Sequence, residues 1–423
     1  MKLVVIADDL TGALDTGVQF AKRGIATEVR LLDAEEEPRS SGEALADSPP
    51  VVVVDTESRH ISRGEARARV RDAARRAAGA TGFYKKTDST LRGNIGAELA
   101  GLMEGCPSGL PLVFAPAFPA LKRTTRGGLQ YVDGVPLEKT AFARDSLNPV
   151  TTADIACIIA ATAEAAPEVL GATPGTLAGF LRNAAGGGKT VVVVDGEKEE
   201  DLAETAAGIR AAAGAGALPL MAGCAGFAAY LPELLDIKTS EPLVPGLSPP
   251  FLAVNGSRNP VSLSQVRAVR DAGAEGIRLE PEILAAPREG GKIIAEKIKD
   301  LFRRKQEALL YNILHAEEAD EFTRLAAARG IQEEEVHHVL PQTYGEIVRC
   351  LAGEATIGVL VVFGGDTLVG ILKALGKSSV IPVAEIFPGV VAARIPGVDN
   401  PPYIVTKAGG FGGTELLRKI FGL

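Results

Sequence analysis

The sequence is poor in the residues that metal and disulfide sites need. It has four cysteines and four histidines, and the cysteines are scattered without a CxxC pair. This argues against a disulfide framework and gives zinc binding little support. The adjacent His337 and His338 are expected at a solvated helix end, because neighbouring side chains on a helix do not easily face one ligand. We expect reduced thiols and a cytoplasmic protein.

Long apolar runs and a basic charge balance are also absent. No stretch approaches the roughly 20 uninterrupted apolar residues that span a bilayer, and the apolar run that ends at Asp8 is too short for a signal peptide. The formal net charge is -8. This balance argues against nucleic-acid or anionic-membrane partners, since both bind basic patches. A small anionic ligand stays compatible, because it needs only a locally positive pocket.

Short, nearly continuous apolar runs alternate with longer Ala-rich segments. This pattern is typical of parallel strands covered on both faces by crossover helices. It predicts an α/β fold with two doubly wound domains and mainly parallel sheets. A Pro-rich linker, "KTSEPLVPGLSPP" (238–250), separates the predicted domains 1–238 and 250–423. The predicted strands are Leu3–Ala7, Val51–Val54, Phe83–Lys85, Leu112–Ala115, Val191–Val194, Leu218–Met221, Phe251–Val254, Val359–Phe363, Val380–Val383 and Tyr403–Val405; the predicted helices include Arg63–Ala78, Asp201–Ala213 and Lys292–Tyr311.

Two acids, Asp8 and Asp9, stand where the strand predicted over Leu3–Ala7 ends. One of them is readily explained as a helix N-cap. The pair is harder to explain in this way, because the carboxyl edge of an open α/β sheet is where ligands bind.

Other predicted strand ends carry more charged and hydroxyl groups than a cap and a turn need. Any single loop of this kind fits a solvated rim equally well, but several on one edge favour a pocket for an anionic, hydroxylated molecule. Arg92 is singled out because its guanidinium can clamp a carboxylate at two points. The residues are Ser58 and Arg59; Lys85, Lys86, Asp88, Ser89, Arg92 and Asn94; and Arg123, Thr124 and Thr125.

The second half contains three glycine-rich turns after predicted strands. Gly364–Thr367 ("GGDT") leads from a strand into a helix, Ser257 lies in a second such turn, and Lys407 precedes the third ("AGGFGG"). A glycine turn at a helix N-terminus presents free N–H groups that suit phosphate. Neither GxxxxGK[ST] nor GxGxxG is present. The three turns together favour binding of a nucleotide's phosphates.

The motifs taken together resemble a known family. "ADDLTGALDTG", "KKTDSTLRGNIGAEL", "PAFP…RTT…GG…YVDGVPLEKTAFARD", "NGS…SQ", "GGDTL", "EIFPGV" and "KAGGFGG" occur in the order and spacing of the four-carbon acid sugar kinases. The resemblance implies two α/β domains and ATP-dependent phosphorylation of a four-carbon sugar acid, such as a tetronate or 3-oxo-tetronate. It implies that the N-terminal domain holds the sugar acid and the C-terminal domain holds the ATP.

The resemblance and the loop analysis together define the candidate site residues. A carboxylate must accept the hydroxyl proton during attack on the γ-phosphoryl group; Asp9 and Asp8 are candidates, and Asp366 is another as base or metal ligand. Arg92 and Lys85 would balance anionic charge. Mg²⁺ would be held mainly by phosphates and water. The substrate-binding candidates are Asp8, Asp9, Arg59, Lys85, Asp88 and Arg92; the nucleotide-binding candidates are Ser257, Gly364, Gly365, Asp366, Thr367, Gly409 and Gly410.

Two alternatives to a kinase stay open from the residues. One is a lyase or aldolase acting on a sugar acid phosphate, with Lys85 or Lys86 as the reactive amine. The other is a binding module that responds to a nucleotide or sugar acid without turnover. Assembly as a homo-oligomer is left open.

Overall fold

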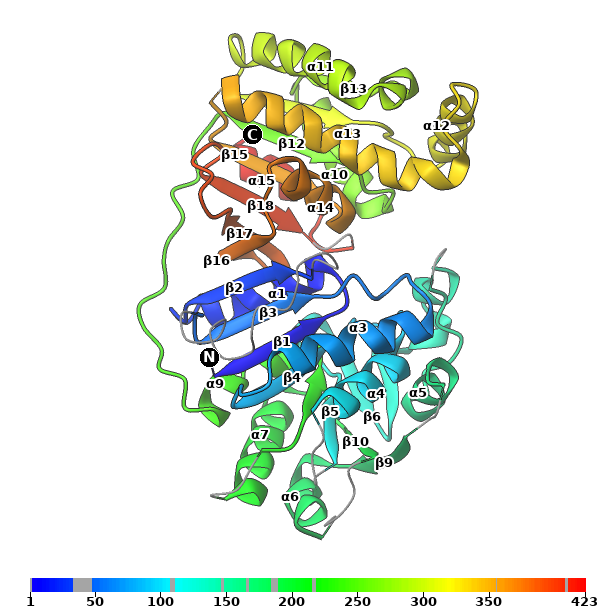
Figure 1. Ribbon diagram of the computed structural model, residues 1–423, viewed down its shortest axis with the longest axis vertical. Coiled ribbons are helices and arrows are strands. Elements are labelled where there is room, and N and C mark those ends of the chain that lie inside the picture. Colours follow the sequence, from blue (N-terminus) through cyan, green and yellow to red (C-terminus); the bar gives the residue numbers. More distant parts are fainter. Residues whose placement is uncertain are drawn as a thin grey trace. The chain divides into compact units, whose positions relative to one another are not determined.

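The computed structural model describes residues 2–32, 48–106, 111–145, 148–164, 167–183, 189–214, 218–354, 356–407 and 410–423 (Figure 1). The chain divides into two compact units, Met1–Glu241 and Pro242–Leu423. No helix or strand lies in residues 238–250, which join them. Each unit has a mainly parallel sheet with helices on its faces, so the predicted α/β fold with a Pro-rich linker is confirmed.

The sheet of the N-terminal unit is parallel throughout its described strands. Strand β1 is buried at all five positions, as expected for a parallel strand that has helices on both faces. In spatial order the strands are β2 (Thr27–Leu31), β3 (Val51–Asp55), β1 (Leu3–Ala7), β4 (Gly82–Lys86), β11 (Met221–Gly223), β5 (Leu112–Ala115), β10 (Thr190–Val194) and β9 (Glu168–Ala172).

Helices pack on both faces of this sheet (Figure 1). Helix α1 packs against β2 and β3, whereas α3 packs on α4 and α4 on α5. A large apolar core fills the space between the sheet and the helices α3, α4 and α5. The helices are α1 (Leu10–Ala21), α3 (Arg63–Arg76), α4 (Ile95–Gly105), α5 (Ile155–Thr162), α6 (Pro174–Asn183), α7 (Glu199–Ala213), α8 (Ala225–Ala228) and α9 (Leu231–Leu234), with 3₁₀ turns at Pro119–Leu121, Leu137–Lys139 and Ala141–Arg144.

The segment "RTTRGGLQYVDGVP" forms a small antiparallel sheet of its own. Its strands are β6 (Arg123–Arg126), β7 (Leu129–Val132) and β8 (Val135–Pro136). Gly127 and Gly128, with φ of +60° and +72°, form the two-residue turn between β6 and β7. Such a turn needs positive φ at both positions, which glycine adopts without strain.

The sheet of the C-terminal unit has five parallel strands and an antiparallel pair at one edge. Strands β12 and β15 are fully buried and lie in its middle. In spatial order the strands are β13 (Gly276–Arg278), β14 (Glu307–Tyr311), β12 (Phe251–Asn255), β15 (Val359–Phe363), β18 (Tyr403–Lys407), β17 (Val390–Arg394) and β16 (Ser379–Phe387).

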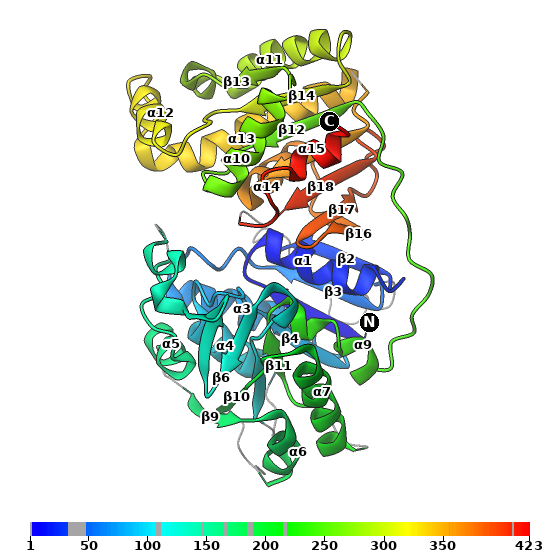
Figure 2. The ribbon, with the colours of Figure 1, turned by 180° about the vertical axis from the view of Figure 1, so that it is seen from behind.

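Two groups of helices cover this second sheet, as the rear view also shows (Figure 2). Helix α10 packs on α15, and their apolar side chains form one core with β12, β15 and β18. Helix α13 packs between α11 and α14. The helices are α10 (Pro260–Asp271), α11 (Pro287–Phe302), α12 (Glu318–Ala327), α13 (Glu333–Glu354), α14 (Gly365–Ala374) and α15 (Leu416–Phe421), with a 3₁₀ turn at Pro281–Ala285.

Two predicted elements are wrong in their bounds. The helix predicted over Lys292–Tyr311 ends at Phe302, and the rest of that segment contains strand β14. Glu307–Tyr311 pairs with β12 and β13, and this pairing decides its structure over local composition. The strand predicted over Leu218–Met221 begins only at Met221. Pro219, two residues earlier, has no N–H for the ladder.

His337 and His338 lie exposed near the start of α13. No group of three or more His, Cys, Asp or Glu side chains in the described parts of the chain is arranged to hold a metal ion. Within the same parts, every helix is too short or too polar to cross a membrane.

Candidate functional site

The strand register brings three loops of the N-terminal unit to one edge of its sheet. Ala7, the last residue of β1, pairs with Asp55 of β3 and with Lys86 of β4. The residues that follow these three strands therefore leave the sheet side by side. This places Asp8 and Asp9, the Ser58–Arg59 loop, and Asp88 at the same carboxyl edge, as the sequence predicts.

Arg59 joins the two acids that follow β1, Asp8 and Asp9. Its Nε donates to Asp8 Oδ2 at 2.7 Å. Its two terminal nitrogens donate to the two oxygens of Asp9 at 2.7 and 2.8 Å, a bidentate fork. All three guanidinium nitrogens are thus used within the protein, and Arg59 acts here as a clamp on two carboxylates.

Asp9 is also the N-cap of helix α1. Its backbone is extended, with φ -148° and ψ 157°, and its Oδ1 accepts a hydrogen bond from the N–H of Gly12 at 2.9 Å. Its side chain is 22% exposed, against 1% for Asp8. Asp9 therefore caps α1 and also lies at the edge of the site. Of Asp8 and Asp9, only Asp9 exposes its carboxylate to solvent.

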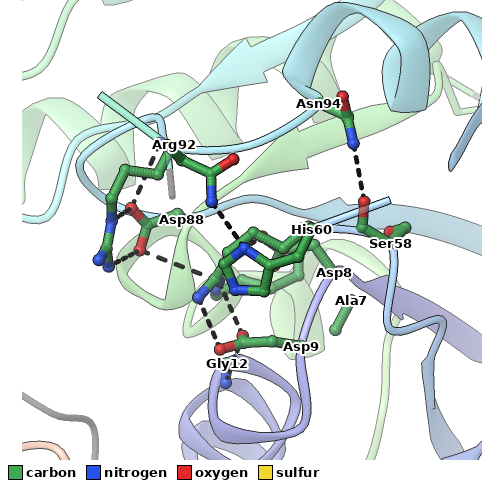
Figure 3. Close-up of polar contacts among 12 residues, drawn as sticks. Ala7, Asp8, Asp9, Gly12, Ser58, His60, Asp88, Arg92 and Asn94 are labelled. Atoms are coloured by element: carbon green, nitrogen blue, oxygen red, sulfur yellow. Dashed lines mark hydrogen bonds and ion pairs between the residues drawn. The ribbon is translucent and has the colours of Figure 1, made fainter. Parts of the chain in front are cut away.

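A second carboxylate–guanidinium pair extends the network (Figure 3). Arg92 holds Asp88 through Nε at 2.8 Å and Nη2 at 3.1 Å. Its remaining nitrogen donates to Asp145 Oδ2 at 3.1 Å. Arg59 Nη2 lies 4.0 Å from Asp88 Oδ1, which connects the two pairs. Acids and guanidinium groups alternate along this edge.

The guanidinium groups keep the buried acids charged. Burial alone raises the pKa of Asp8, but the charges of Arg59, Lys86 and Lys85 outweigh it, and the pKa is lowered. At Asp88, burial also raises the pKa, but the charges of Arg92 and Arg59 outweigh it. The pKa of Asp88 is therefore held well below its usual range. Both carboxylates are therefore ionised at neutral pH.

Lys85, predicted to bind substrate, points away from this network. Its side chain is fully buried, and its Nζ lies 3.1 Å from Glu98 Oε2 on α4. The same Nζ donates to the carbonyl oxygens of Ile6, at 3.2 Å, and Lys86, at 2.7 Å. The Ser58 hydroxyl donates to the other oxygen of Glu98. The structure thus shows Lys85 in an internal ion pair that links β4, α4 and the loop after β3.

The C-terminal unit brings its glycine turns together in the same way. Asn255 at the end of β12 pairs with Phe363 of β15, and Phe363 pairs with Lys407 of β18. The turns that follow, with Ser257, Gly364–Thr367 and Gly410, therefore leave one carboxyl edge. Gly409 lies outside the described residues.

Two glycines of these turns are required by the backbone. Gly364 has φ +107° and caps helix α14. At Gly256, an added Cβ would lie 2.1 Å from Thr367 Oγ1, so only glycine lets the two turns approach. Thr367 is buried and Asp366 is exposed in the first turn of α14. The arrangement offers backbone N–H groups of a helix N-terminus beside an exposed carboxylate.

Two buried side chains hold the third glycine-rich turn. Gln265 of α10 donates from Nε2 to the carbonyl oxygens of Phe411, Gly412 and Gly413 at 3.0–3.1 Å. Lys407 Nζ donates to the Phe411 carbonyl at 3.1 Å. Burial lowers the pKa of Lys407 to about 7.

Sequence reasoning did not single out three of these side chains. Asp145, Glu98 and Gln265 each lie inside a quoted motif, "AFARD", "NIGAEL" and "NGS…SQ" respectively. A charged or amide residue in an otherwise apolar helical stretch, as in Glu98 and Gln265, is the signal that could have identified a buried partner.

Comparisons with known proteins agree with the division of the chain into an N-terminal and a C-terminal unit. A family model described as a sugar-binding N-terminal domain matches residues 3–231, and one described as a nucleotide-binding C-terminal domain matches residues 252–417. A D-threonate kinase of Salmonella typhimurium is 32% identical over 99% of this chain and 97% of the relative. A D-erythronate kinase of Heliobacterium modesticaldum is 30% identical over 98% of this chain and 94% of the relative. A solved Haemophilus influenzae structure, 20% identical, shares the fold with a TM-score of 0.70 over 99% of both chains.

Proposed function

Because the chain belongs to the four-carbon acid sugar kinase family, we propose that it transfers the γ-phosphoryl group of ATP to a hydroxyl of a tetronate. The N-terminal unit binds the sugar acid and the C-terminal unit binds the nucleotide. The observation that carries this proposal is the edge network of Asp8, Arg59, Asp9 and Asp88. It presents carboxylates held in fixed positions, beside guanidinium groups, to a hydroxylated, anionic ligand.

Asp9 is the proposed general base. Its carboxylate is the more exposed of the first pair, and each carboxylate oxygen has two lone pairs. Oδ2 accepts one hydrogen bond, from Arg59 Nη1, and can accept the proton of a substrate hydroxyl with its other lone pair. That hydroxyl oxygen then attacks the γ-phosphorus, the bond to the β,γ-bridging oxygen breaks, and ADP leaves.

Arg59 and Asp8 position this base. The bidentate fork fixes the plane of the Asp9 carboxylate, and the Nε bond to buried Asp8 fixes Arg59 in turn. Arg92 and Asp88 supply the neighbouring polar surface for the sugar acid. A preorganised network of this kind costs little reorganisation when the hydroxyl loses its proton.

The turns of the C-terminal unit are the proposed phosphate site. Gly364, Gly365 and Thr367 begin helix α14, whose N-terminus favours anions. Ser257 and Gly410 complete the edge. Mg²⁺ fits this site, since it binds phosphates and water with one or two carboxylates, and Asp366 is an exposed carboxylate there. When bound, the ion neutralises phosphate charge.

The lyase and binding-module alternatives are not favoured. The similar proteins of known name are kinases, and Lys85, one candidate amine for a lyase, is held in a buried ion pair. For the substrate, the names of the relatives support D-threonate and D-erythronate as the first compounds to test, with 3-oxo-tetronate beside them.

The test is an ADP-release assay with MgATP and each of these sugar acids, alongside reactions that lack either ATP or the acid. ADP release that requires a four-carbon acid is expected. Consumption of the acid without ATP would instead indicate a lyase, and binding without turnover would indicate a module.

A further inference from the structure

The two adjacent lysines at the end of β4 lie on opposite faces of the sheet. Successive side chains of a strand alternate between faces, and the structure follows this rule. Lys85 meets Glu98 of α4, whereas Lys86 reaches the first turn of α1, where its Nζ lies 2.7 Å from the position that a Cβ on Gly12 would occupy. The neighbours therefore have different surroundings and can have different roles.

Lys86 is buried but has no bound partner. Lys86 is 3% exposed. Within the described parts of the chain its ammonium has neither a hydrogen-bond acceptor nor a carboxylate within ion-pair distance. Asp9 Oδ1 lies 2.5 Å from the same Cβ position on Gly12, so the ammonium faces the acid that caps α1. An ammonium withdrawn from water without a partner is costly, which makes Lys86 unusual.

The other cations of this edge already have partners. Each nitrogen of Arg59 donates to Asp8 or Asp9, and each nitrogen of Arg92 donates to Asp88 or Asp145. Lys85 has Glu98 and two carbonyls. Among these four described cations, Lys86 alone keeps its three donors for a ligand.

The position of Lys86 suits an anionic oxygen. It lies at the N-terminus of the twelve-residue helix α1, where the helix dipole also favours negative charge. Gly12 lets the Lys86 ammonium and Asp9 Oδ1 both lie close to the first turn of α1, because a methyl group there would clash with both. Lys86 and the proposed base therefore lie beside each other at the first turn of α1.

We propose that Lys86 binds an anionic oxygen of the reactants beside Asp9. This inference rests on the proposed kinase function and adds a binding residue to it. The reaction offers two sources of such an oxygen, the carboxylate of the sugar acid and the transferring phosphoryl group. The ammonium suits either one as a compact point charge with three donors.

The test compares Lys86→Met, Lys86→Arg and Lys85→Met in the full-length protein with MgATP and D-threonate, or with whichever tetronate the wild type turns over. If Lys86 holds the carboxylate, Lys86→Met raises KM for the sugar acid at least about tenfold and leaves KM for ATP within about twofold. If it holds the phosphoryl group, kcat falls at least about tenfold instead. Lys86→Arg keeps the charge and should recover part of either loss.

Thermal unfolding separates binding from a structural role. Lys86→Met breaks no hydrogen bond or close ion pair but removes one of the charges that lower the pKa of Asp8, so its Tm should fall by less than that of Lys85→Met. Lys85→Met leaves Glu98 buried without its cation and should lower Tm. Unchanged kcat and KM values in Lys86→Met would overturn the proposal, and so would a Tm loss as large as that of Lys85→Met. If Lys86→Met does not fold, normal kinetics of a folded Lys86→Gln would overturn it equally. A wild type without tetronate-dependent turnover would instead refute the kinase function itself.

Discussion

Replacing Arg59 with methionine should destabilise the N-terminal unit strongly. The Arg59 side chain is 10% exposed and its partner Asp8 is 1% exposed, so the variant leaves a buried carboxylate without its main counter-charge. Removing one partner of a buried ion pair typically costs about 3–5 kcal/mol. For a unit of this size that corresponds to a Tm decrease of roughly 6–20 °C. Differential scanning calorimetry at pH 7 measures the decrease directly.

Arg30→Met is the matched control in the same unit. Arg30 also donates two hydrogen bonds to a carboxylate, that of Glu28, but its side chain is 39% exposed. Such surface pairs contribute about 0–1 kcal/mol, so this variant should unfold close to the wild type. Equal Tm values for the two variants would refute the view that Arg59 clamps a buried charge.

The Arg59→Met defect should also depend on pH. In the wild type the pKa of Asp8 is lowered, so its pairing stabilises the fold above the unfolded-state pKa of about 4, and this contribution is lost as pH falls. Without Arg59, burial dominates and raises the pKa of Asp8. The penalty is then full at neutral pH and is relieved as Asp8 takes up a proton. The Tm difference should therefore shrink between pH 7 and pH 4, and a constant difference would contradict the assignment.

Three further predictions concern the proposed machinery. Asp9→Asn keeps a cap oxygen but removes the base and one of the two oxygens that accept from Arg59, so kcat should fall about 10²–10⁴-fold. Its Tm should fall less than that of Arg59→Met, since Asp8 still pairs with Arg59; a folded, active variant would transfer the role to Asp8 or Asp366. Gly364→Ala forces a residue with a Cβ to φ +107°, which should lower the free energy of unfolding by about 1–3 kcal/mol and raise KM for ATP. In the control Gly353→Ala a Cβ meets nothing within 4 Å, so stability and KM for ATP should both stay unchanged. Burial lowers the pKa of Lys407 to about 7, so its ammonium loses its proton between pH 6 and pH 8. The affinity for MgATP should fall over this range. Calorimetric titration of Lys407→Arg should show no such fall.

Local patterns predict much of the fold. The apolar run of β1 has the same bounds in sequence and structure, and Asp9 caps α1 as its residue type suggests. The parallel strands follow from their continuous burial. The segment around β14 could not be predicted in this way, because Glu307–Tyr311 becomes a strand through pairing with residues 56 positions earlier in the chain.

The candidate site, like the fold, is predictable where local patterns decide and unpredictable where distant partners decide. Charged residues at strand ends identify the edge, and the parallel register then brings Asp8 and Asp88 together across 80 positions of sequence. The partners are less predictable. Whether a lysine faces the site or an internal acid depends on which side of β4 it lies, so the adjacent Lys85 and Lys86 could not be separated before the neighbouring helices were placed.

The most direct test of the kinase function is detection of the product itself. The protein is incubated with MgATP and D-threonate, D-erythronate or 3-oxo-tetronate, and the mixture is followed by ³¹P NMR. A phosphate-ester signal should appear with at least one of these acids as the γ-phosphoryl signal of ATP declines, and it should be strongly reduced with Asp9→Asn. Release of inorganic phosphate alone, or loss of the acid in a reaction without ATP, would contradict the transfer of a phosphoryl group to a four-carbon sugar acid.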